Sequence, residues 1–269
     1  MLLAQLSDLH LRPAGKGAYR VVETNMLAER ALRAIARFRP RLDALVISGD
    51  LAFDGASAEY QALAAMLARY IHIPVYVIPG NHDRRALMKT VLGHLPGVAE
   101  DEEFVHYVVE QGPLRLVMLD TLVPDRPHGE LCPRRLDFLR RALAAAPDRP
   151  TVIVMHHPPF LCGIEHVDGI ILREPDVFAG IVAANPQVQA VLCGHHHRMI
   201  ISRIGTAIVQ IAPSAAHQLE LALVPGTPGG FVMEPAAFLV HRWDGGTLVS
   251  HLAYVEDFEG PYPFIPEQD

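Results

Sequence analysis

Five short motifs of acidic, amide and imidazole side chains recur in the first part of the chain. They read Asp8-Leu9-His10, Gly49-Asp50, Gly80-Asn81-His82-Asp83, His156-His157 and Gly194-His195-His196-His197. Each motif directly follows a short apolar run. A single Asp or His in such a place is most often a helix cap or a turn residue. Five of them at the same structural position make coincidence a poor explanation, and indicate one shared site.

The residue types in these motifs suit the hydrolysis of phosphate esters. That reaction must stabilise negative charge on the phosphoryl oxygens while a hydroxide attacks in line with the leaving group. Two divalent metals roughly 3.5 to 4 Å apart can do both when one ligand bridges them. Nitrogen and oxygen ligands without a thiolate suit Mn²⁺, Fe²⁺, Co²⁺ or Zn²⁺, and do not single out one of these ions.

The apolar runs before the motifs predict five buried strands, and amphipathic stretches between them predict helices. The strands cover residues 2–6, 42–47, 75–78, 152–155 and 188–193, and the helices cover 21–38, 58–70 and 134–145. Strands that alternate with helices form buried sheets flanked by helices, with ligand chemistry at the carboxyl ends of the strands. The motifs therefore should meet at one edge of the fold.

Two parts of the chain break the alternation. Residues 104–109 and 114–119 flank a Gln-Gly-Pro turn and predict a hairpin, and the chain from residue 207 onward reads as all-β. There, residues 238–243 and 247–254 flank Asp244-Gly245-Gly246, a strong hairpin signal. Residues 162–174 and 223–236 look like insertions, which could overhang the site as a lid or mediate subunit contacts.

Composition favours a globular chain without a polyanionic partner. The chain has 269 residues, 50% of them hydrophobic, and its mean hydropathy is +0.19, which supplies a full core. The net charge of −7 disfavours binding to nucleic acid, which needs a basic face. The three cysteines show no paired spacing that would indicate disulfides. No apolar run approaches the roughly 18 residues that span a bilayer, and the N-terminal residues lack the basic region of a signal peptide. We therefore expect a cytoplasmic protein.

The complete set of motifs resembles the calcineurin-like metallophosphoesterase superfamily in order and spacing over about the first 200 residues. Within it, the chain resembles the bacterial class III phosphodiesterases, which hydrolyse glycerophosphodiesters or cyclic nucleotides. Ile78-Pro-Gly-Asn-His-Asp, Met155-His-His-Pro-Pro and Ser214-Ala-Ala-His217-Gln are especially similar to the glycerophosphodiesterase branch. The resemblance implies an α/β fold, a four-layer α/β/β/α sandwich with a small cap or dimerisation insertion.

The same resemblance implies the domain limits and the roles of the motif residues. Residues 1–255 would form the metallophosphoesterase domain, with cap or oligomerisation elements at about 160–175 and 220–237, and 256–269 would be a C-terminal tail. One metal would be held by Asp8, His10 and His197, the other by Asn81, His156 and His195, and Asp50 would bridge them. His82 would be catalytic, and His82, Asn81 and His217 would contact substrate. A metal-bound hydroxide would be the nucleophile.

The neighbours of these residues have more than one interpretation. His157 and His196 stand next to ligands on extended backbone and should point away from them, in supporting roles. Asp83 could orient His82 or cap the helix that follows it. His217 could line the substrate pocket or be an ordinary surface histidine. The far side of a substrate could rest on residues shortly after the first motif, namely Arg12, Tyr19 and Asn25.

These observations predict a dinuclear metal-dependent phosphodiesterase that acts on small phosphodiesters, with glycerophosphodiesters favoured and a 3′,5′-cyclic nucleotide as the alternative. We expect a homo-oligomer with neither a nucleic-acid polymer nor a membrane as partner. A non-catalytic scaffold should have lost ligands, yet all seven are present. A protein phosphatase should carry an arginine soon after the second motif, where this chain reads Leu51-Ala-Phe-Asp-Gly. A DNA nuclease should carry a basic stripe.

Overall fold

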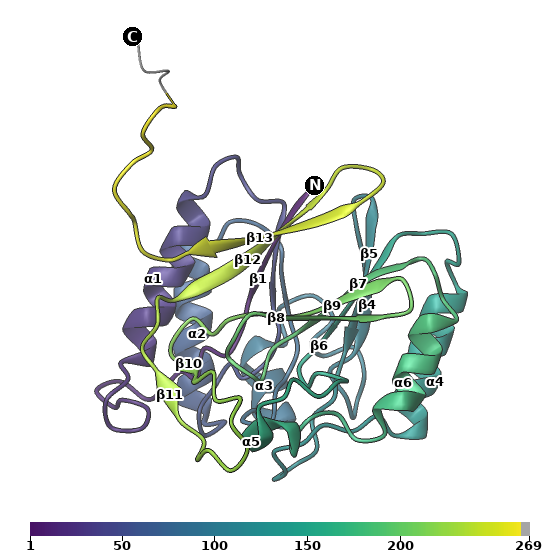
Figure 1. Ribbon diagram of the computed structural model, residues 1–269, viewed down its shortest axis with the longest axis horizontal. Coiled ribbons are helices and arrows are strands. Elements are labelled where there is room, and N and C mark those ends of the chain that lie inside the picture. Colours follow the sequence, from purple (N-terminus) through teal and green to yellow (C-terminus); the bar gives the residue numbers. More distant parts are fainter. Residues whose placement is uncertain (265–269) are drawn as a thin grey trace.

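Two β-sheets pack face to face between two groups of helices (Figure 1). The computed structural model describes residues 1–264. The first sheet has the order β13-β12-β1-β2-β3 and the second the order β4-β5-β6-β7-β9-β8. The strands of the first sheet are β1 (Leu2–Leu6), β2 (Ala44–Ile47), β3 (Val75–Val77), β12 (Ala237–Trp243) and β13 (Leu248–Tyr254). Those of the second are β4 (Tyr107–Gln111), β5 (Leu114–Leu119), β6 (Thr151–Met155), β7 (Val188–Cys193), β8 (Ile200–Ile204) and β9 (Ala207–Ile211). A separate short pair joins β10 (Gln218–Leu219) and β11 (Phe231–Val232).

The longer helices cover the outer faces of the two sheets. Figure 1 shows α1 (Thr24–Arg37) and α2 (Ser57–Tyr70) on one side of the molecule, and α4 (Pro133–Ala144) and α6 (Pro175–Ala183) on the other. The remaining helices are α3 (Arg85–Leu92) and the short α5 (Glu165–Asp168). In α1 the buried residues Leu27, Ala31 and Ile35 recur at a spacing of four, which is one face of a helix. The fold is thus the predicted four-layer α/β/β/α sandwich.

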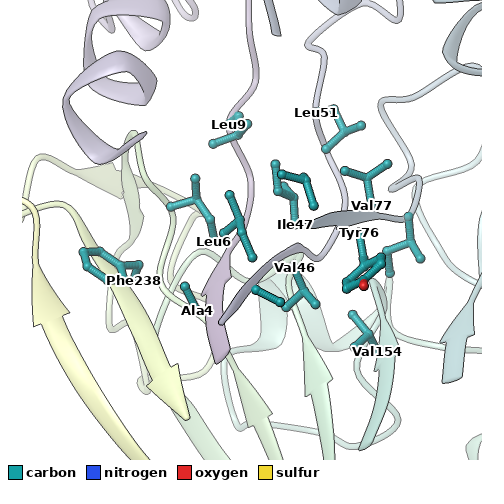
Figure 2. Close-up of a cluster of buried hydrophobic side chains, with 14 of the residues drawn as sticks. Ala4, Leu6, Leu9, Val46, Ile47, Leu51, Tyr76, Val77, Val154 and Phe238 are labelled. Carbon is teal, nitrogen blue, oxygen red and sulfur yellow. The ribbon is translucent and has the colours of Figure 1, made fainter. Parts of the chain in front are cut away.

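The central strands are buried on both faces, which is why they read as unbroken apolar runs. Figure 2 shows Leu6, Ile47 and Val77 from three adjacent strands packed in one cluster with Phe238. Strands β1, β2 and β3 are parallel, with Leu6 opposite Ile47 and Ile47 opposite Val77. Parallel strands in this register end together. The residues that follow them therefore gather at one edge of the sheet.

The sequence located the strands that precede the motifs and three of the helices, with bounds that differ by a few residues. It gave no bounds for α3, and it missed α5, α6 and β8. Helix α3 is a segment of eight residues directly after a motif, too short to show a clear period. The predicted helix 21–38 begins later, at Thr24, because Tyr19 and Arg20 have positive φ and Ala18 pairs with Val22.

Two further findings concern the chain as a whole. None of the helices in residues 1–264 has the length and apolar content to cross a bilayer. Of the tail predicted at 256–269, residues 265–269 lie outside the described part of the chain.

Candidate metal centre

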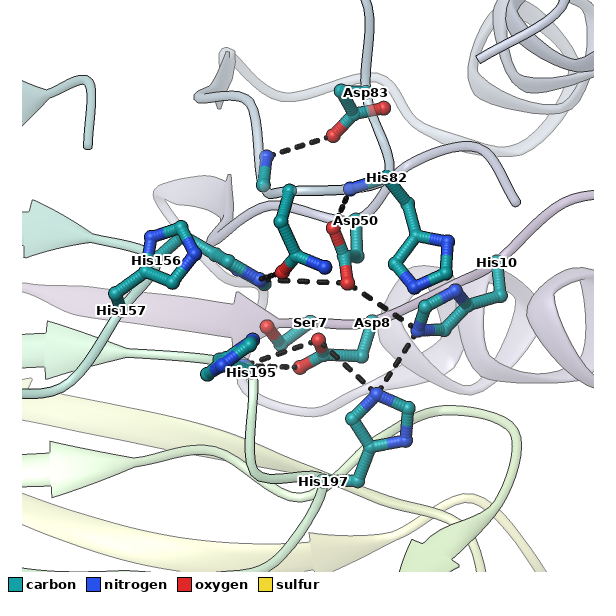
Figure 3. A network of polar contacts seen from close by, with 12 residues as sticks. Ser7, Asp8, His10, Asp50, His82, Asp83, His156, His157, His195 and His197 are labelled. Atoms are coloured by element: carbon teal, nitrogen blue, oxygen red, sulfur yellow. Dashed lines mark hydrogen bonds and ion pairs between the residues drawn. The ribbon is translucent and has the colours of Figure 1, made fainter. Parts of the chain in front are cut away.

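The strand ends bring the predicted ligands together between the two sheets (Figure 3). Several of these residues have a backbone conformation that non-glycine residues rarely adopt. Positive φ occurs at nine non-glycine residues of the described chain, and five of the nine are predicted ligands, namely Asp8, His10, Asp50, His195 and His197. This conformation costs about 1 to 3 kcal/mol per residue and clusters at functional sites. The fold therefore maintains local strain where the motifs meet.

One half of the centre contains two imidazoles that face each other. The Nε2 atoms of His10 and His197 lie 2.9 Å apart. The Nδ1 atom of His197 lies 3.1 Å from the carbonyl oxygen of His217, which can only accept, so in the neutral ring Nδ1 carries the proton and Nε2 has the lone pair. Carboxylates close the ring, because His197 Nε2 is 3.4 Å from Asp8 and His10 Nε2 is 3.5 Å from Asp50. Lone pairs converging in this way fit a cation.

The other half shows the same arrangement around His156. Its Nδ1 lies 2.8 Å from the carbonyl oxygen of Ser48, so in the neutral ring Nε2 is the nitrogen with the lone pair. This Nε2 faces two oxygens, Asn81 Oδ1 at 3.2 Å and Asp50 Oδ2 at 3.4 Å. The Nε2 of His195 lies 3.1 Å from the carbonyl oxygen of Ile170, which leaves Nδ1 of that ring as the lone-pair nitrogen. These donors also fit a cation.

Asp50 belongs to both halves. Its Oδ2 is within 3.5 Å of His10 Nε2 and 3.4 Å of His156 Nε2, while its Oδ1 accepts the backbone N–H of His82 at 2.9 Å. Burial opposes the charge of Asp50, but His156 and His82 hold its pKa well below the usual range. Burial likewise opposes a charge on His156, but Asp50 raises its pKa to about 9. Asp50 is thus a charged carboxylate placed between two sets of ligands.

The glycines of the motifs permit this close packing. A Cβ at Gly80 would lie 2.2 Å from Asp50 Oδ1, and a Cβ at Gly49, whose φ is +100°, would lie 2.3 Å from His156 Nδ1. Neither neighbour can yield without moving a predicted ligand. Gly49 and Gly80 are therefore required by the ligands beside them.

His82 lies at the edge of the centre and has one ring nitrogen fixed. Its Nδ1 is 2.7 Å from the carbonyl oxygen of Phe53, and its ring meets that of His10 edge-on, with centroids 4.7 Å apart. Because the carbonyl oxygen accepts a hydrogen bond from Nδ1–H, Nε2 is the nitrogen left to face the cavity. In this arrangement Nε2 carries a proton only when the ring is an imidazolium.

Asp83 performs neither of its two predicted roles. It does not contact the His82 ring, and Arg84 rather than Asp83 occupies the N-cap position of α3. Its buried carboxylate instead accepts the backbone N–H groups of Gly80 at 2.8 Å and of Leu51 and Ala52 at 3.1 Å, together with the Tyr60 hydroxyl at 3.0 Å. Asp83 thus ties together the loops that carry Asp50 and Asn81.

A cavity of about 450 Å³ opens above the centre. Its wall includes the aromatic rings of Tyr19, His217 and Phe231, whose centroids lie 5.1 to 5.3 Å apart. Burial lowers the pKa of His217 to about 3, so this ring is neutral. The wall also includes His166 and Ile170 from the segment around α5. Both suspected insertions thus contribute to the cavity.

Other residues near the first motif face elsewhere. The backbone N–H and carbonyl of Arg12 are held by the side chain of Asn25, and its guanidinium pairs with Asp54 and lies 4.5 Å from the centre of the Phe53 ring. Of the three residues suggested for the far side of a substrate, Tyr19 therefore lines the cavity, while Arg12 and Asn25 do not.

His157 lies closer to the metal centre than the sequence indicated. A ring nitrogen of His157 lies within 4.8 Å of those of His156 and His195, which groups the three as possible ligands. Its Nδ1 contacts the Thr121 hydroxyl at 2.7 Å. His196 is buried and also borders the cavity. The sequence also gave no sign of the carbonyl groups of Ser48, Phe53 and Ile170, because backbone atoms carry no residue-specific pattern.

Comparison with known proteins gives a consistent picture. The family model described as calcineurin-like phosphoesterase matches residues 1–199. A protein of Arcobacter nitrofigilis named probable glycerophosphodiester phosphodiesterase GpdQ is 33% identical over 270 residues, covering 100% of this chain and 98% of the relative. The 3′,5′-cyclic adenosine monophosphate phosphodiesterase CpdA of Pseudomonas aeruginosa is 31% identical over 271 residues, covering 97% and 93%. A dimetal phosphatase from Danio rerio shares the fold, with a TM-score of 0.72 at 15% identity, covering 96% of this chain and 97% of that one.

Proposed function

This chain belongs to the calcineurin-like phosphoesterase family, and we propose that it is a dinuclear metal-dependent phosphodiesterase that hydrolyses small phosphodiesters, with glycerophosphodiesters favoured. The supporting observation is the place of Asp50, a buried carboxylate whose Oδ2 lies within 3.5 Å of lone-pair nitrogens from both halves of the centre. A carboxylate so placed can bridge two cations.

The proposed ligands divide between two ions that share Asp50. One ion would be held by Asp8, His10 and His197, and the other by Asn81, His156 and His195. The donors are all nitrogen and oxygen, which suits Fe, Mn, Zn or Co. When bound, two such ions withdraw electron density from phosphoryl oxygens and lower the pKa of water. The buried His195 backbone N–H, 3.1 Å from both oxygens of Asp8, holds that carboxylate in place for the first ion.

His82 and Asn81 would handle the substrate at the rim of the centre. With Nδ1 of His82 bound to the Phe53 carbonyl, Nε2 of the imidazolium can donate a proton to the leaving oxygen or a hydrogen bond to a phosphoryl oxygen. Asn81 stands beside His156 and presents the rest of its amide to the cavity. His217 would contact the substrate from the aromatic wall.

The cavity favours a diester over a monoester. Within residues 1–264, none of the side chains that line it belongs to arginine or lysine. A monoester carries a second negative charge that a clamping cation normally offsets, whereas a diester carries only one. The second motif continues to Phe53 and Asp54, with no arginine, and the Arg12 guanidinium is already paired with Asp54. The charge of the site thus matches a monoanionic substrate.

A cyclic nucleotide is the second candidate, and the aromatic wall is the observation that favours it. Tyr19 and Phe231 are partly exposed, with their ring centroids 5.3 Å apart, and could pack against a nucleobase. Some relatives are named for cyclic nucleotides and others for glycerophosphodiesters. Both are small diesters, so the same centre serves either.

A substrate and metal panel tests the proposal. Metal-depleted protein would be reconstituted with Mn²⁺, Fe²⁺, Co²⁺ or Zn²⁺ and assayed with glycerophosphoethanolamine, 3′,5′-cyclic AMP, bis(p-nitrophenyl) phosphate and p-nitrophenyl phosphate. We expect two bound metals per chain and faster turnover of diesters than of the monoester. Full turnover without metal, or a consistent preference for the monoester, would contradict the proposal.

We also propose that residues 160–175 and 220–237 form a cap on the domain formed by residues 1–255. The backbone N–H of Gly226 donates to the Glu165 carboxylate at 2.7 Å, so the two segments contact each other beside the cavity. Leu223 and Val224 are 58% and 72% exposed there, which supports self-association through the cap. Val224→Asp should then lower the oligomeric state in sedimentation, and an unchanged state would exclude this contact.

The three cysteines, Cys132, Cys162 and Cys193, are unpaired, which supports a cytoplasmic location. Fractionation of cells that express the tagged protein would test it, and recovery in the periplasm would contradict it.

A further inference from the structure

A second cavity, of about 520 Å³, lies at the opposite end of the first sheet from the metal centre. It is bordered by the start of β1, the turn that follows α1, the end of β12 and the middle of β13 (Figure 1). The metal centre follows the carboxyl ends of β1 and β2, whereas this cavity begins at Met1 and Leu2. Its volume is in the range of about 300 to 1,000 Å³ that is usual for small-molecule sites.

The strand register shows which side chains border this cavity together. Arg242 of β12 stands opposite Leu2 of β1, and Val240 stands opposite His251 of β13. Residues paired across strands share a face, and so do residues two apart on one strand. Leu2, Val240, Arg242 and His251 therefore lie on the outer face of the sheet. Helix α1 covers this face only as far as Phe38, whose ring lies 6.3 Å from that of Phe238.

The rim of the cavity carries two arginines. Arg39, Arg242 and His251 line it and are exposed, and within residues 1–264 none of the lining residues is acidic. The Arg39 guanidinium donates to the carbonyl oxygens of Ala36 and Phe38 rather than to a carboxylate. This rim is unusual in a chain whose net charge is −7.

The acidic side chains nearby are occupied by backbone groups. The Asp43 carboxylate accepts the N–H of Leu2 at 2.6 Å. Asp244, two residues after Arg242, accepts the N–H groups of Gly246 and Thr247 at 3.0 Å each. Within residues 1–264 neither carboxylate forms a hydrogen bond or ion pair with Arg39 or Arg242, although the pKa of Asp244 is lowered by these N–H groups and also by the charge of Arg242. The guanidinium groups of the rim therefore keep N–H donors that another anion can accept.

We propose that this cavity binds a small amphiphilic anion, with an apolar body packed on Leu2, Val240 and Phe38 and an anionic head between Arg39 and Arg242. An apolar floor alone would accept any apolar molecule, and exposed arginines alone would accept any anion. Together they select a molecule that has both parts. Guanidinium groups suit carboxylate, sulfonate and phosphate heads, because their N–H donors match pairs of oxygens.

The test uses probes that a phosphodiesterase cannot hydrolyse. Binding of 8-anilinonaphthalene-1-sulfonate to the metal-loaded protein would be followed by fluorescence, and octane-1-sulfonate would be used as a competitor. Octyltrimethylammonium keeps the chain but reverses the charge, and methanesulfonate keeps the head without the chain. We expect octane-1-sulfonate to displace the dye, and the other two to be at least tenfold weaker.

Variants locate the binding. Arg242→Gln should weaken dye binding about five- to tenfold, the scale of one charge-assisted hydrogen bond at a partly exposed site, and Arg39→Gln should act in the same direction. Arg203→Gln is the matched control, because it removes the same charge from exposed β8 in the other sheet. It should change binding less than twofold. Asp50→Ala should leave binding unchanged, so the result does not depend on the proposed metal centre.

Three results would overturn the proposal. If Arg242→Gln and Arg203→Gln weakened dye binding equally, the loss would reflect the overall charge of the protein and not this cavity. If octyltrimethylammonium and octane-1-sulfonate bound with equal affinity, the arginines would not select the charge of the ligand. Sedimentation showing a dimer that Arg242→Gln dissociates, with dye bound only by the monomer, would make this face a contact between copies of the chain instead of a ligand site.

Discussion

Replacing His82 by alanine should separate the chemistry of the site from its metal binding. The ring is held at Nδ1 by the Phe53 carbonyl and packs edge-on against His10, while its backbone N–H donates to Asp50. Alanine keeps the backbone N–H, so the position of Asp50 should survive. The ring is only partly buried, and its loss should cost no more than about 1 kcal/mol of unfolding free energy. Metal content should remain close to that of the wild type.

Turnover, by contrast, should fall steeply. One proton or hydrogen-bond donor aimed at the reacting oxygens is worth about 10²- to 10³-fold, or about 2.7 to 4 kcal/mol of transition-state stabilisation. In this site the proposed donor is Nε2 of His82. We therefore expect His82→Ala to lose at least about 10²-fold in kcat. His94→Ala is the control, because it removes an exposed imidazole outside the cavity and should leave kcat within about twofold.

The leaving group distinguishes the two roles of His82. If the ring protonates the leaving oxygen, the loss should shrink for bis(p-nitrophenyl) phosphate, since nitrophenolate leaves without a proton. If the ring stabilises charge on the phosphoryl oxygens, the loss should be equal for activated and unactivated diesters. The assay is kcat for both substrate types, with metal content measured on the same samples. A variant with normal kcat on both substrates would remove His82 from the mechanism, and one stripped of metal would refute the reasoning about Asp50.

Three further predictions follow from single contacts. Asp50→Ala should bind neither metal stoichiometrically, whereas Asn81→Ala should retain one metal per chain, as measured by elemental analysis. Two metals bound per chain of Asp50→Ala would exclude Asp50 as the bridging ligand. Gly80→Ala should weaken metal binding about tenfold or more, because its Cβ would lie 2.2 Å from Asp50 Oδ1. The control Gly169→Ala, with open space around it, should bind metal as the wild type does, and equal metal affinities of the two variants in a calorimetric titration would contradict this. Burial lowers the pKa of His241 to about 3, so the unfolded chain takes up this proton near pH 6.5 and the folded chain does not. The free energy of unfolding should then fall by up to about 1.4 kcal/mol per pH unit as the pH drops from about 6.5 towards 3. His241→Gln should reduce that slope in urea titrations, and an identical slope would show that other groups control acid stability.

The positions of the strands along the chain and of the motifs that follow them could be predicted from local patterns. Unbroken apolar runs such as residues 188–193 identify strands buried on both faces, and polar residues directly after them must lie at the carboxyl ends. Because parallel strands end at one edge, Asp8, Asp50 and His156 could be assigned to one site without coordinates. Residue chemistry then indicated metal ligands.

Local patterns were weaker where an element is short or a contact is distant. The interpretation of Asp83 was wrong because its partners include Tyr60, on α2, and the backbone of Leu51 and Ala52. Neither sequence neighbours nor periodicity report such contacts. The helix expected after Asp83 could be given no bounds for a related reason, since the eight residues of α3 hold little more than two turns.

The sequence by itself determined which residue types stand at the strand ends, since those positions depend on hydrophobic periodicity along the chain. Only the tertiary structure decided which ring nitrogen of each histidine faces the centre, because the carbonyl oxygens of Ser48, Ile170 and His217 fix that choice. It also decided that Tyr19 and Phe231, more than two hundred residues apart, form one wall. Such contacts depend on how the sheets pack, and packing joins residues that no local pattern connects.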